Sequence, residues 1–268
     1  MIGKATARLS LHILGSLSGT EPMPGRKHSS FLLELPGGGL YCFDAGEGCS
    51  RTAHLMGADL LRLKAIFISH PHIDHVGGLA NLLWTLRKLS EAQSRTLQGP
   101  IPVFHPSPGQ FEAVTALLAA AGQSFGLAVQ GSVGEGRIYD DGALSVDARA
   151  NAHIPAAGGE PPLSYSYRIA AGDRRIVFSG DIHSVEELGD WLLGCDMLLM
   201  ESGHHSPPDV CRRLIDMGAT IGTLVWTHHG LDILRDPAGI EKQCAAVWRG
   251  AMIFASDRMT LSLGGNAE

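Results

Sequence analysis

The chain has 268 residues, of which 44% are hydrophobic and 18% are charged, and its formal net charge is -6. This composition is typical of a globular protein with a sizeable core, and it excludes a disordered chain. No apolar stretch approaches the length of a membrane-spanning helix. The chain also lacks a long basic run, so we expect no extended basic surface for a large nucleic acid such as transfer RNA.

The five cysteines bear on the cellular compartment. They are odd in number and show no CxxC spacing, which predicts neither a disulfide framework nor a zinc ribbon. The first residues, MIGKATARLSLHILGSLSG, lack the uninterrupted apolar segment of a signal peptide. We therefore expect a cytoplasmic protein without contact with a membrane.

Short apolar runs separated by glycine and proline predict many strands joined by tight loops. In the first half, strands are expected at residues 9–14, 30–35, 40–43 and 63–68, and helices with apolar residues at helical spacing at 78–90 and 110–121. In the second half, we expect a hairpin of 165–169 and 175–179, a strand at 197–200, a helix at 207–217 and a strand at 223–227. The chain is thus predicted to be α/β. Residues 1–268 are expected to form one domain of two similar halves that join near 131–142.

Histidine and aspartate residues follow several of these strands at the point where each strand ends. His70, His153, Asp181 and His228 each come directly or shortly after an apolar or alternating run. In layered α/β folds such strand ends converge on one edge of a sheet, where loops carry function. Residues that are far apart in the sequence are therefore expected to share one site.

The segment SHPHIDHVGG carries the strongest signal. In an extended segment, alternate residues point the same way, so His70, His72 and Asp74 are expected on one side. His75 has the opposite parity, and we expect a turn into the helix near Gly77 to bring it round toward a second metal position. Imidazole and carboxylate groups suit zinc, or manganese or iron where oxygen ligands weigh more. A polar surface loop is the alternative, but four donors at HxHxDH spacing favour two metal ions.

HPHIDH resembles the HxHxDH signature of the metallo-β-lactamase superfamily, whose fold is a four-layer αββα sandwich with a dinuclear metal centre at the sheet edge. The resemblance is greatest to the branch of RNase Z and PhnP-like phosphodiesterases. Further segments resemble motifs of this branch in the same order along the chain: LGSLSGTEPMPG, HPSPGQFEAV, VFSGD, ESGHHS, VWTHHG and ASDRMTLSL.

The resemblance implies a set of seven metal ligands. His70, His72 and His153 would hold one ion, Asp74, His75 and His228 the other, and Asp181 would bridge the two. His228 is preferred to His229 because it directly follows Thr227, as in the TH pattern of the family. His183 follows Asp181 too closely to fit the pattern.

The resemblance also implies catalytic roles. Two metal ions would lower the pKa of a water molecule, which Asp74 would orient or deprotonate. His205 in GHHS would protonate the leaving alkoxide, with His204 as its alternative. Glu201 would orient His205 or a ligating histidine, although it could equally be an ordinary surface carboxylate. The early loop with Arg26 and His28–Ser30 could contact a phosphate or carry no function.

Two departures from RNase Z bear on the substrate. Only 27 residues separate His153 from Asp181, too few for the long transfer-RNA arm of full RNase Z enzymes, and HGLDI stands where those enzymes tend to have serine, arginine and tyrosine. We therefore expect a metal-dependent phosphodiesterase for a small phosphodiester, cyclic nucleotide or short oligonucleotide. The alternatives are an ester, thioester or lactone hydrolase with the same metals, and a non-enzymatic metal-binding accessory protein. A homodimer is common in this branch and is a further expectation.

Overall fold

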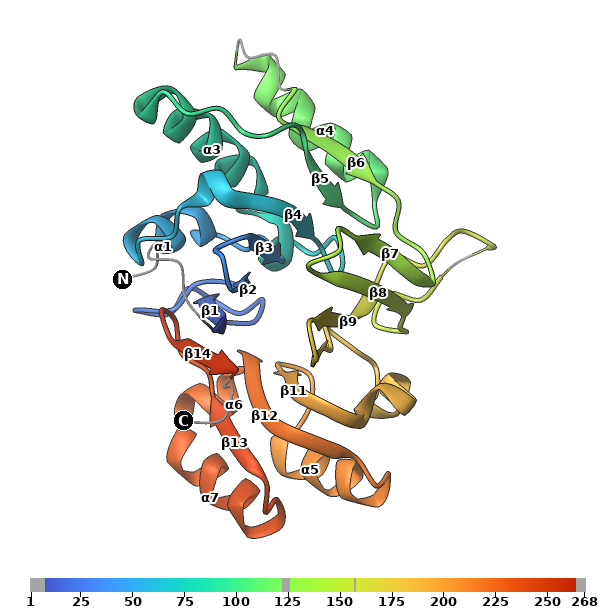
Figure 1. Cartoon of the computed structure of the whole chain (residues 1–268). Helices are drawn as coiled ribbons and strands as arrows, with labels where there is room; N and C mark the ends of the chain where they lie inside the picture. Colours follow the sequence, from blue (N-terminus) through green and yellow to red (C-terminus); the bar gives the residue numbers. More distant parts are fainter. Residues whose placement is uncertain (1–7, 122–125, 157, 264–268) are drawn as a thin grey trace. The chain divides into compact units, whose positions relative to one another are not determined.

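The computed structural model describes residues 8–121, 126–156 and 158–263 and divides into two compact units. Of these residues, the first unit comprises 8–15, 23–121, 126–133 and 257–263, and the second comprises 16–22, 134–156 and 158–256. The chain thus passes from the first unit to the second between Val133 and Gly134. Each unit consists of one mixed seven-stranded sheet with helices against it (Figure 1).

The sheet of the first unit has the strand order β14-β1-β2-β3-β4-β5-β6. Its strands are β1 (Leu9–Gly15), β2 (Ser30–Glu34), β3 (Leu40–Phe43), β4 (Leu63–Phe67), β5 (Ile101–Phe104), β6 (Ala128–Gly131) and β14 (Thr260–Leu263). The pairs from β14 to β3 are antiparallel, and those from β3 to β6 are parallel. The carboxyl ends of β3, β4 and β5 therefore lie along the same edge of this sheet.

Helices bury their apolar residues against one face of the first sheet. These elements are α1 (Cys49–Leu55), η1 (Leu60–Arg62), α2 (Ile73–Val76), α3 (Leu79–Gln93) and α4 (Pro108–Ala120). Leu79, Leu82, Leu83 and Leu86 recur on one side of α3 and are fully buried in a core with strand residues such as Ile66. Burial of each such side chain contributes about 1.5–3 kcal/mol. The helical spacing of apolar residues in the sequence therefore marks the buried face of α3.

The sheet of the second unit has the order β13-β12-β11-β10-β9-β8-β7. Its strands are β7 (Gly136–Asp140), β8 (Ser145–Ala150), β9 (Tyr165–Ala171), β10 (Arg174–Phe178), β11 (Leu193–Ser202), β12 (Thr220–His229) and β13 (Ala251–Phe254). The pairs from β10 to β13 are parallel, and those from β7 to β10 are antiparallel. Strands β8, β10, β11 and β12 thus run in the same direction and end at the same edge.

The helices of the second unit form a second core with this sheet. They are η2 (Val185–Leu192), α5 (Pro207–Asp216), α6 (Leu231–Arg235) and α7 (Pro237–Val247). Trp226 on β12 and Leu214 on α5 are fully buried in this core. Pro207 stands at the start of α5, where the missing N–H of proline costs no hydrogen bond.

Most predicted elements agree with the structure to within a few residues, and the β9–β10 hairpin is confirmed. The passage between the units, from Val133 to Gly134, lies within the segment 131–142, of which Gly136–Asp140 forms β7 and pairs with β8. One local expectation is wrong. The segment after His72 is not extended, because α2 begins at Ile73 with His72 as its N-cap. Asp74 and His75 are therefore placed by a helical turn, and not by the alternation of a strand.

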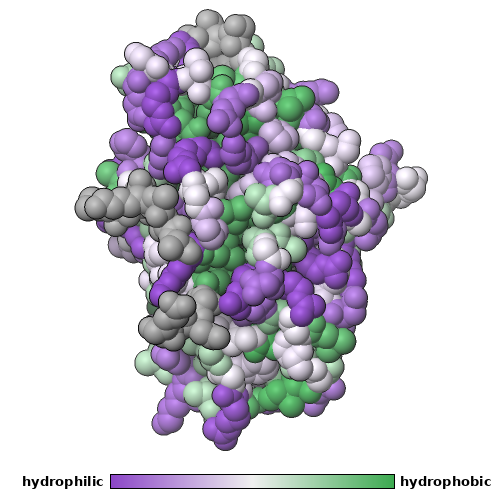
Figure 2. Space-filling view, in the orientation of Figure 1, coloured by the Kyte–Doolittle hydropathy of each residue, from purple (hydrophilic) through white to green (hydrophobic). Residues whose placement is uncertain are grey.

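Hydrophilic residues cover much of the face drawn in Figure 2, with smaller hydrophobic areas between them. Large exposed hydrophobic side chains include Leu55, Ile73 and Leu117. Among the residues that the structure describes, no helix combines the length and the apolar character needed to cross a membrane. All five cysteines are buried and free.

Candidate metal centre

Four predicted ligands of the first unit lie on the short segment that follows β4. His70 and His75 are fully buried, and their imidazole ring centroids are 4.0 Å apart. The Nε2 atom of His70 lies 3.0 Å from Nδ1 of His72, and Nε2 of His75 lies 3.3 Å from Oδ2 of Asp74. The structure thus brings the nitrogen and oxygen donors of this segment together in two close pairs.

A buried carboxylate at the end of β3 anchors this segment. Asp44 accepts hydrogen bonds from the backbone N–H of Ser69 at 2.7 Å and from the Ser69 hydroxyl at 3.0 Å, and its Oδ2 lies 2.6 Å from Nδ1 of His75. When Nδ1–H of His75 donates a hydrogen bond to Asp44, the lone pair of Nε2 points away from Asp44 and suits a metal. Our sequence analysis missed Asp44, although its position directly after a strand was the available signal.

Two features bring the neighbouring loops close to the histidine segment: a side-chain hydrogen bond and glycines that allow the backbones to approach. Gln110 of α4 donates from Nε2 to the carbonyl of Pro71 at 2.9 Å, which connects the HPSPGQ motif to HPHIDH. A Cβ atom at Gly78 would lie 2.2 Å from the carbonyl oxygen of Gly46, and one at Gly46 would lie 2.4 Å from that of Asp74. These approaches leave no room for a side chain, so glycine is required at both positions.

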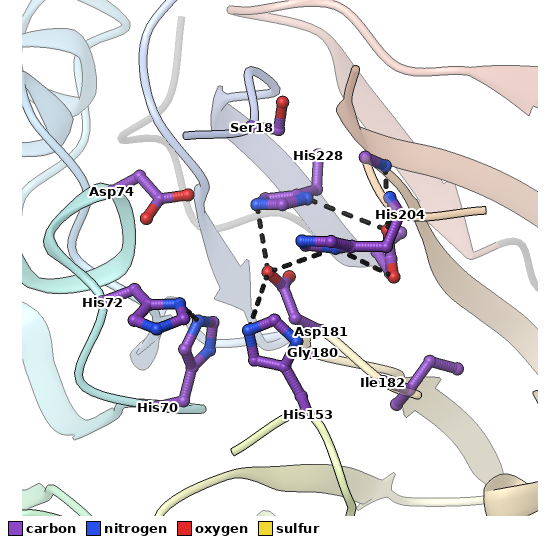
Figure 3. A network of polar contacts seen from close by, with 12 residues as sticks. Ser18, His70, His72, Asp74, His153, Gly180, Asp181, Ile182, His204 and His228 are labelled. Carbon is purple, nitrogen blue, oxygen red and sulfur yellow. Dashed lines mark hydrogen bonds and ion pairs between the residues drawn. The ribbon is translucent and has the colours of Figure 1, made fainter. Parts of the chain in front are cut away.

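Three predicted ligands of the second unit gather around one carboxylate. Asp181 follows β10, His153 follows β8, and His228 lies near the end of β12. Oδ2 of Asp181 lies 3.7 Å from Nε2 of His153 and 3.4 Å from Nε2 of His228 (Figure 3). The common direction of these strands brings together residues that are up to 75 positions apart.

A β-bulge places His228. In the pairing of β11 with β12, Glu201 faces Thr227 and Ser202 faces His229, so His228 is the extra residue. Its φ angle of 51° is in the left-handed region, which is uncommon for a residue with a side chain. His229 instead donates from Nε2 to the carbonyl of Ala255 at 2.7 Å. Of the two histidines in VWTHHG, His228 is therefore the one beside Asp181.

The turn ESGHHS carries a buried carboxylate between two histidines. Oε2 of Glu201 accepts the backbone N–H groups of Gly203 at 2.8 Å and His204 at 2.9 Å. Its Oε1 lies 3.3 Å from Nδ1 of His204 and 3.3 Å from Nε2 of His205. Glu201 is fully buried, so the interpretation of it as a surface carboxylate is wrong.

The two histidines of this turn have different surroundings. Nε2 of His205 also donates to the carbonyl of Ile182 at 2.9 Å, which anchors its ring on the protein. Nδ1 of His204 lies 3.6 Å from Oδ2 of Asp181, and its side chain is 45% exposed. His204 together with His153 and Asp181 could hold a metal ion. His204 therefore lies close to the predicted ligands Asp181 and His153.

Other histidines have structural partners. His12 is buried on β1, where Nε2 lies 3.0 Å from Glu34 and Nδ1 lies 2.9 Å from the Thr260 hydroxyl. Nδ1 of His105 accepts the backbone N–H of Ser107 at 3.0 Å. Burial lowers the pKa of His105 to about 4. The prediction that neither is a ligand is consistent with these contacts.

Two pairs of donor atoms, one in each unit, have the spacing of ligands around a metal ion. With zinc bonds of about 2.0–2.2 Å, the corners of a tetrahedron are about 3.3–3.6 Å apart. The pair His75–Asp74 at 3.3 Å and the pair His228–Asp181 at 3.4 Å have this separation. The histidine and aspartate clusters of both units are thus suited to divalent cations such as zinc.

Residues 41–235 match the family model described as a β-lactamase superfamily domain. The chain belongs to the metallo-β-lactamase superfamily. Its fold is also similar to that of the metallo-β-lactamase fold protein YhfI from Bacillus subtilis, with a TM-score of 0.74 and 17% sequence identity over 95% of this chain and 99% of that chain. The predicted fold class is thereby confirmed.

Curated relatives of this superfamily member include ribonuclease Z of Bradyrhizobium diazoefficiens, 26% identical over 72% of this chain and 76% of the relative. Ribonuclease Z of Gloeothece citriformis is 33% identical over 68% of this chain, and the match spans about half of that relative, 52%. Family membership and the histidine and aspartate clusters together identify a metal-dependent hydrolase that is distantly similar to ribonuclease Z.

Proposed function

We propose that the protein is a phosphodiesterase that hydrolyses a small phosphodiester, such as a cyclic nucleotide or a short oligonucleotide. The observation that carries the proposal is the Glu201–His204–His205 turn, in which a buried carboxylate lies 3.3 Å from a nitrogen of each of two histidines. Hydrolysis of an alkyl phosphodiester expels a poor alkoxide leaving group, and a positioned imidazole can protonate it.

The metal ligands in this proposal are His70, His72, Asp74, His75, His153, Asp181 and His228. When bound, two divalent ions supply Lewis acidity that lowers the pKa of water and offsets the charge of a phosphodiester. Zinc is our first choice because its bond lengths match the donor spacing, and manganese and iron are the alternatives. Asp74 would both help to hold a metal ion and orient or deprotonate the nucleophilic water.

For the proton donor, the geometry favours His204 over the predicted His205. Glu201 is held by two backbone N–H groups and can accept a hydrogen bond from Nδ1–H of His204, so that the proton on Nε2 can be delivered to the leaving oxygen. His205 already donates from Nε2 to a backbone carbonyl, so it is better suited to support the turn. In this proposal Glu201 is a positioning residue.

Transfer-RNA processing is not the function that we propose. In the interval between His153 and Asp181, residues 165–178 are taken up by the β9–β10 hairpin and its turn. An acidic chain without a long basic run is also poorly suited to transfer RNA. Efficient cleavage of a transfer-RNA precursor at its 3′ side would contradict this part of the proposal.

A substrate panel tests the proposal. Protein purified with added zinc, manganese or iron is assayed with bis-p-nitrophenyl phosphate, a thioester and a lactone. We expect hydrolysis of the phosphodiester that a chelator abolishes and that is at least tenfold faster than that of the other two. A preference for the thioester or the lactone would favour the alternative hydrolase function. The cytoplasmic location and the homodimer stay predictions.

A further inference from the structure

A cavity in the second unit adjoins the turn that carries His204. It has a volume of about 410 Å³, which is within the range of small-molecule sites. Residues 202–207 line one side, and residues 230–233 of the loop and helix α6 line another. His204 thus belongs both to this cavity and to the surroundings of Asp181, from which its Nδ1 is 3.6 Å away.

The wall of the cavity is partly apolar. Pro207 at the start of α5, Leu231 and Ile233 of α6, and Ile240 of α7 contribute hydrocarbon surface. Ile233 is buried, with 3% of its surface exposed. Such a wall suits the flat or apolar part of an organic group, because burial of apolar surface is favourable.

The rest of the lining is polar but carries no cation. Thr20, Ser206 and Asp232 offer hydroxyl and carboxylate oxygens. None of the lining residues, all of which the structure describes, is a lysine or an arginine. The arginines of the neighbouring helix α5 pair elsewhere, Arg212 with Asp209 and Arg213 with Glu186. Apart from its histidines, the cavity thus presents one ionisable side chain, the carboxylate of Asp232.

We infer that this cavity binds the leaving group of the substrate and that this group is an uncharged nucleoside or a similar hydroxylated alcohol. The inference rests on the proposed phosphodiesterase function, because it places the departing oxygen beside His204. Asp232 accepts hydrogen bonds from the hydroxyls of such an alcohol and repels a second phosphate. Asp232 is therefore a specificity-determining residue, and chains that continue with further phosphates on the leaving side are poor substrates.

Three diuridine substrates test this inference with the full-length, metal-replete protein. They are UpU, pUpU with an extra 5′-phosphate, and UpUp with an extra 3′-phosphate. The products of UpU show which nucleoside departs. If the 5′-side uridine departs, the other product is uridine 5′-phosphate; if the 3′-side uridine departs, the other product is uridine 3′-phosphate. We expect the extra phosphate to lower kcat/KM roughly tenfold when it is on the departing nucleoside. On the other nucleoside it should have a smaller effect.

Variants assign the discrimination to one side chain. Asp232→Lys should reverse the preference and favour the substrate whose departing nucleoside carries the phosphate, and Asp232→Asn should reduce the discrimination. Asp216→Lys is the matched control, because it makes the same charge change at an exposed position at the end of α5, outside the cavity lining. It should keep the wild-type preference. Saturation-transfer NMR gives an independent measurement, in which uridine should bind the wild-type protein and bind less to Asp232→Lys.

The outcomes separate this inference from the proposed function. If bis-p-nitrophenyl phosphate is not hydrolysed, the phosphodiesterase function itself fails. If it is hydrolysed while UpU is not cleaved, or while the three diuridines react equally, the leaving-group site is overturned. Equal effects of Asp232→Lys and Asp216→Lys would also overturn the role of Asp232.

Discussion

The two units assemble their clusters of histidine and aspartate in different ways. In the first unit, four predicted ligands come from six consecutive residues, and Asp44, a buried carboxylate directly after the neighbouring strand β3, holds Ser69 and His75 of this segment. In the second unit, each residue comes from the end of a different strand, and Asp181 is at the centre. The first cluster thus depends on local sequence, whereas the second depends on strand topology.

This difference predicts unequal sensitivity to mutation, and replacement of Asp181 should have the largest effect. Asp181→Ala removes the carboxylate that both His153 and His228 face, so we expect metal content to fall from about two equivalents to below one and activity to fall at least 10³-fold, because two-metal catalysis is lost. Elemental analysis after purification with added metal measures this. Asp216→Ala, at an exposed site, is the control. Full metal content in Asp181→Ala would show that this carboxylate is not a bridging ligand.

The paired histidines of the second unit give the next prediction. His204→Ala should lower kcat for a poor, alkoxide-like leaving group by roughly 10²- to 10⁴-fold, and should lower it much less for p-nitrophenolate, which needs little protonation. His205→Ala is the matched control and should change both rates by similar, smaller factors. Steady-state kinetics on both kinds of substrate distinguish the two. The opposite ranking of the variants would restore His205 as the acid.

Replacement of Asp44, which contacts the histidine segment of the first unit, should have a moderate effect on metal affinity. Asp44→Asn keeps the shape of the side chain but weakens its charge-assisted contact with His75, so we expect metal affinity to fall by roughly 10- to 100-fold. Competition with a chromogenic chelator measures the affinity. Asp59→Asn, which only breaks a surface ion pair with Arg95, serves as the comparison. An unchanged affinity in Asp44→Asn would mean that the histidine segment holds its geometry without this carboxylate.

The smallest effect concerns stability and a histidine outside the clusters. The pKa of His105 is about 4 because of burial, below the ordinary value of 6.5, so the unfolded chain binds the proton more readily. The contribution of uncharged, buried His105 to the free energy of unfolding is complete above about pH 6.5 and is lost as the pH falls toward 4. We expect the contribution of His105 to the free energy of unfolding to be about 2 kcal/mol smaller at pH 5 than at pH 7.5.

Urea unfolding of the metal-free protein at the two pH values, compared with His105→Gln, isolates this contribution. The variant lacks the titrating group, so its free energy of unfolding should change less between pH 7.5 and pH 5 than that of the wild type. Equal changes in both proteins would place the acid sensitivity in other groups.

The same contrast explains what the sequence could predict. HPHIDH is contiguous, and the spacing of its donors identifies a metal site without knowledge of the fold. The strands that precede His153, Asp181 and His228 could be recognised by their apolar pattern, and the family resemblance connected them. The short helix α2 could not be read, because four residues are too few to show a helical period. Asp44 and the environment of Glu201 depend on contacts that form only after folding.

The choice between adjacent histidines was the hardest for sequence reasoning. In GHHS the motif favoured His205, whereas our proposal, based on the contacts in the folded turn, assigns the acid to His204. In VWTHHG the prediction of His228 agrees with the position of this residue beside Asp181. His228 is itself the left-handed, extra residue of a bulge, and no residue type in that segment predicts the bulge.

The bulge gives the protein an internal spectroscopic reporter. His229, the residue after His228, is buried, and its Nε2–H donates a hydrogen bond to the carbonyl oxygen of Ala255, with 2.7 Å between Nε2 and the oxygen. Such a proton exchanges slowly with water and resonates apart from the crowded amide region in a nitrogen-15 NMR spectrum. Its chemical shift should respond when a cation binds to the neighbouring imidazole, so metal occupancy could be followed in solution without any substrate.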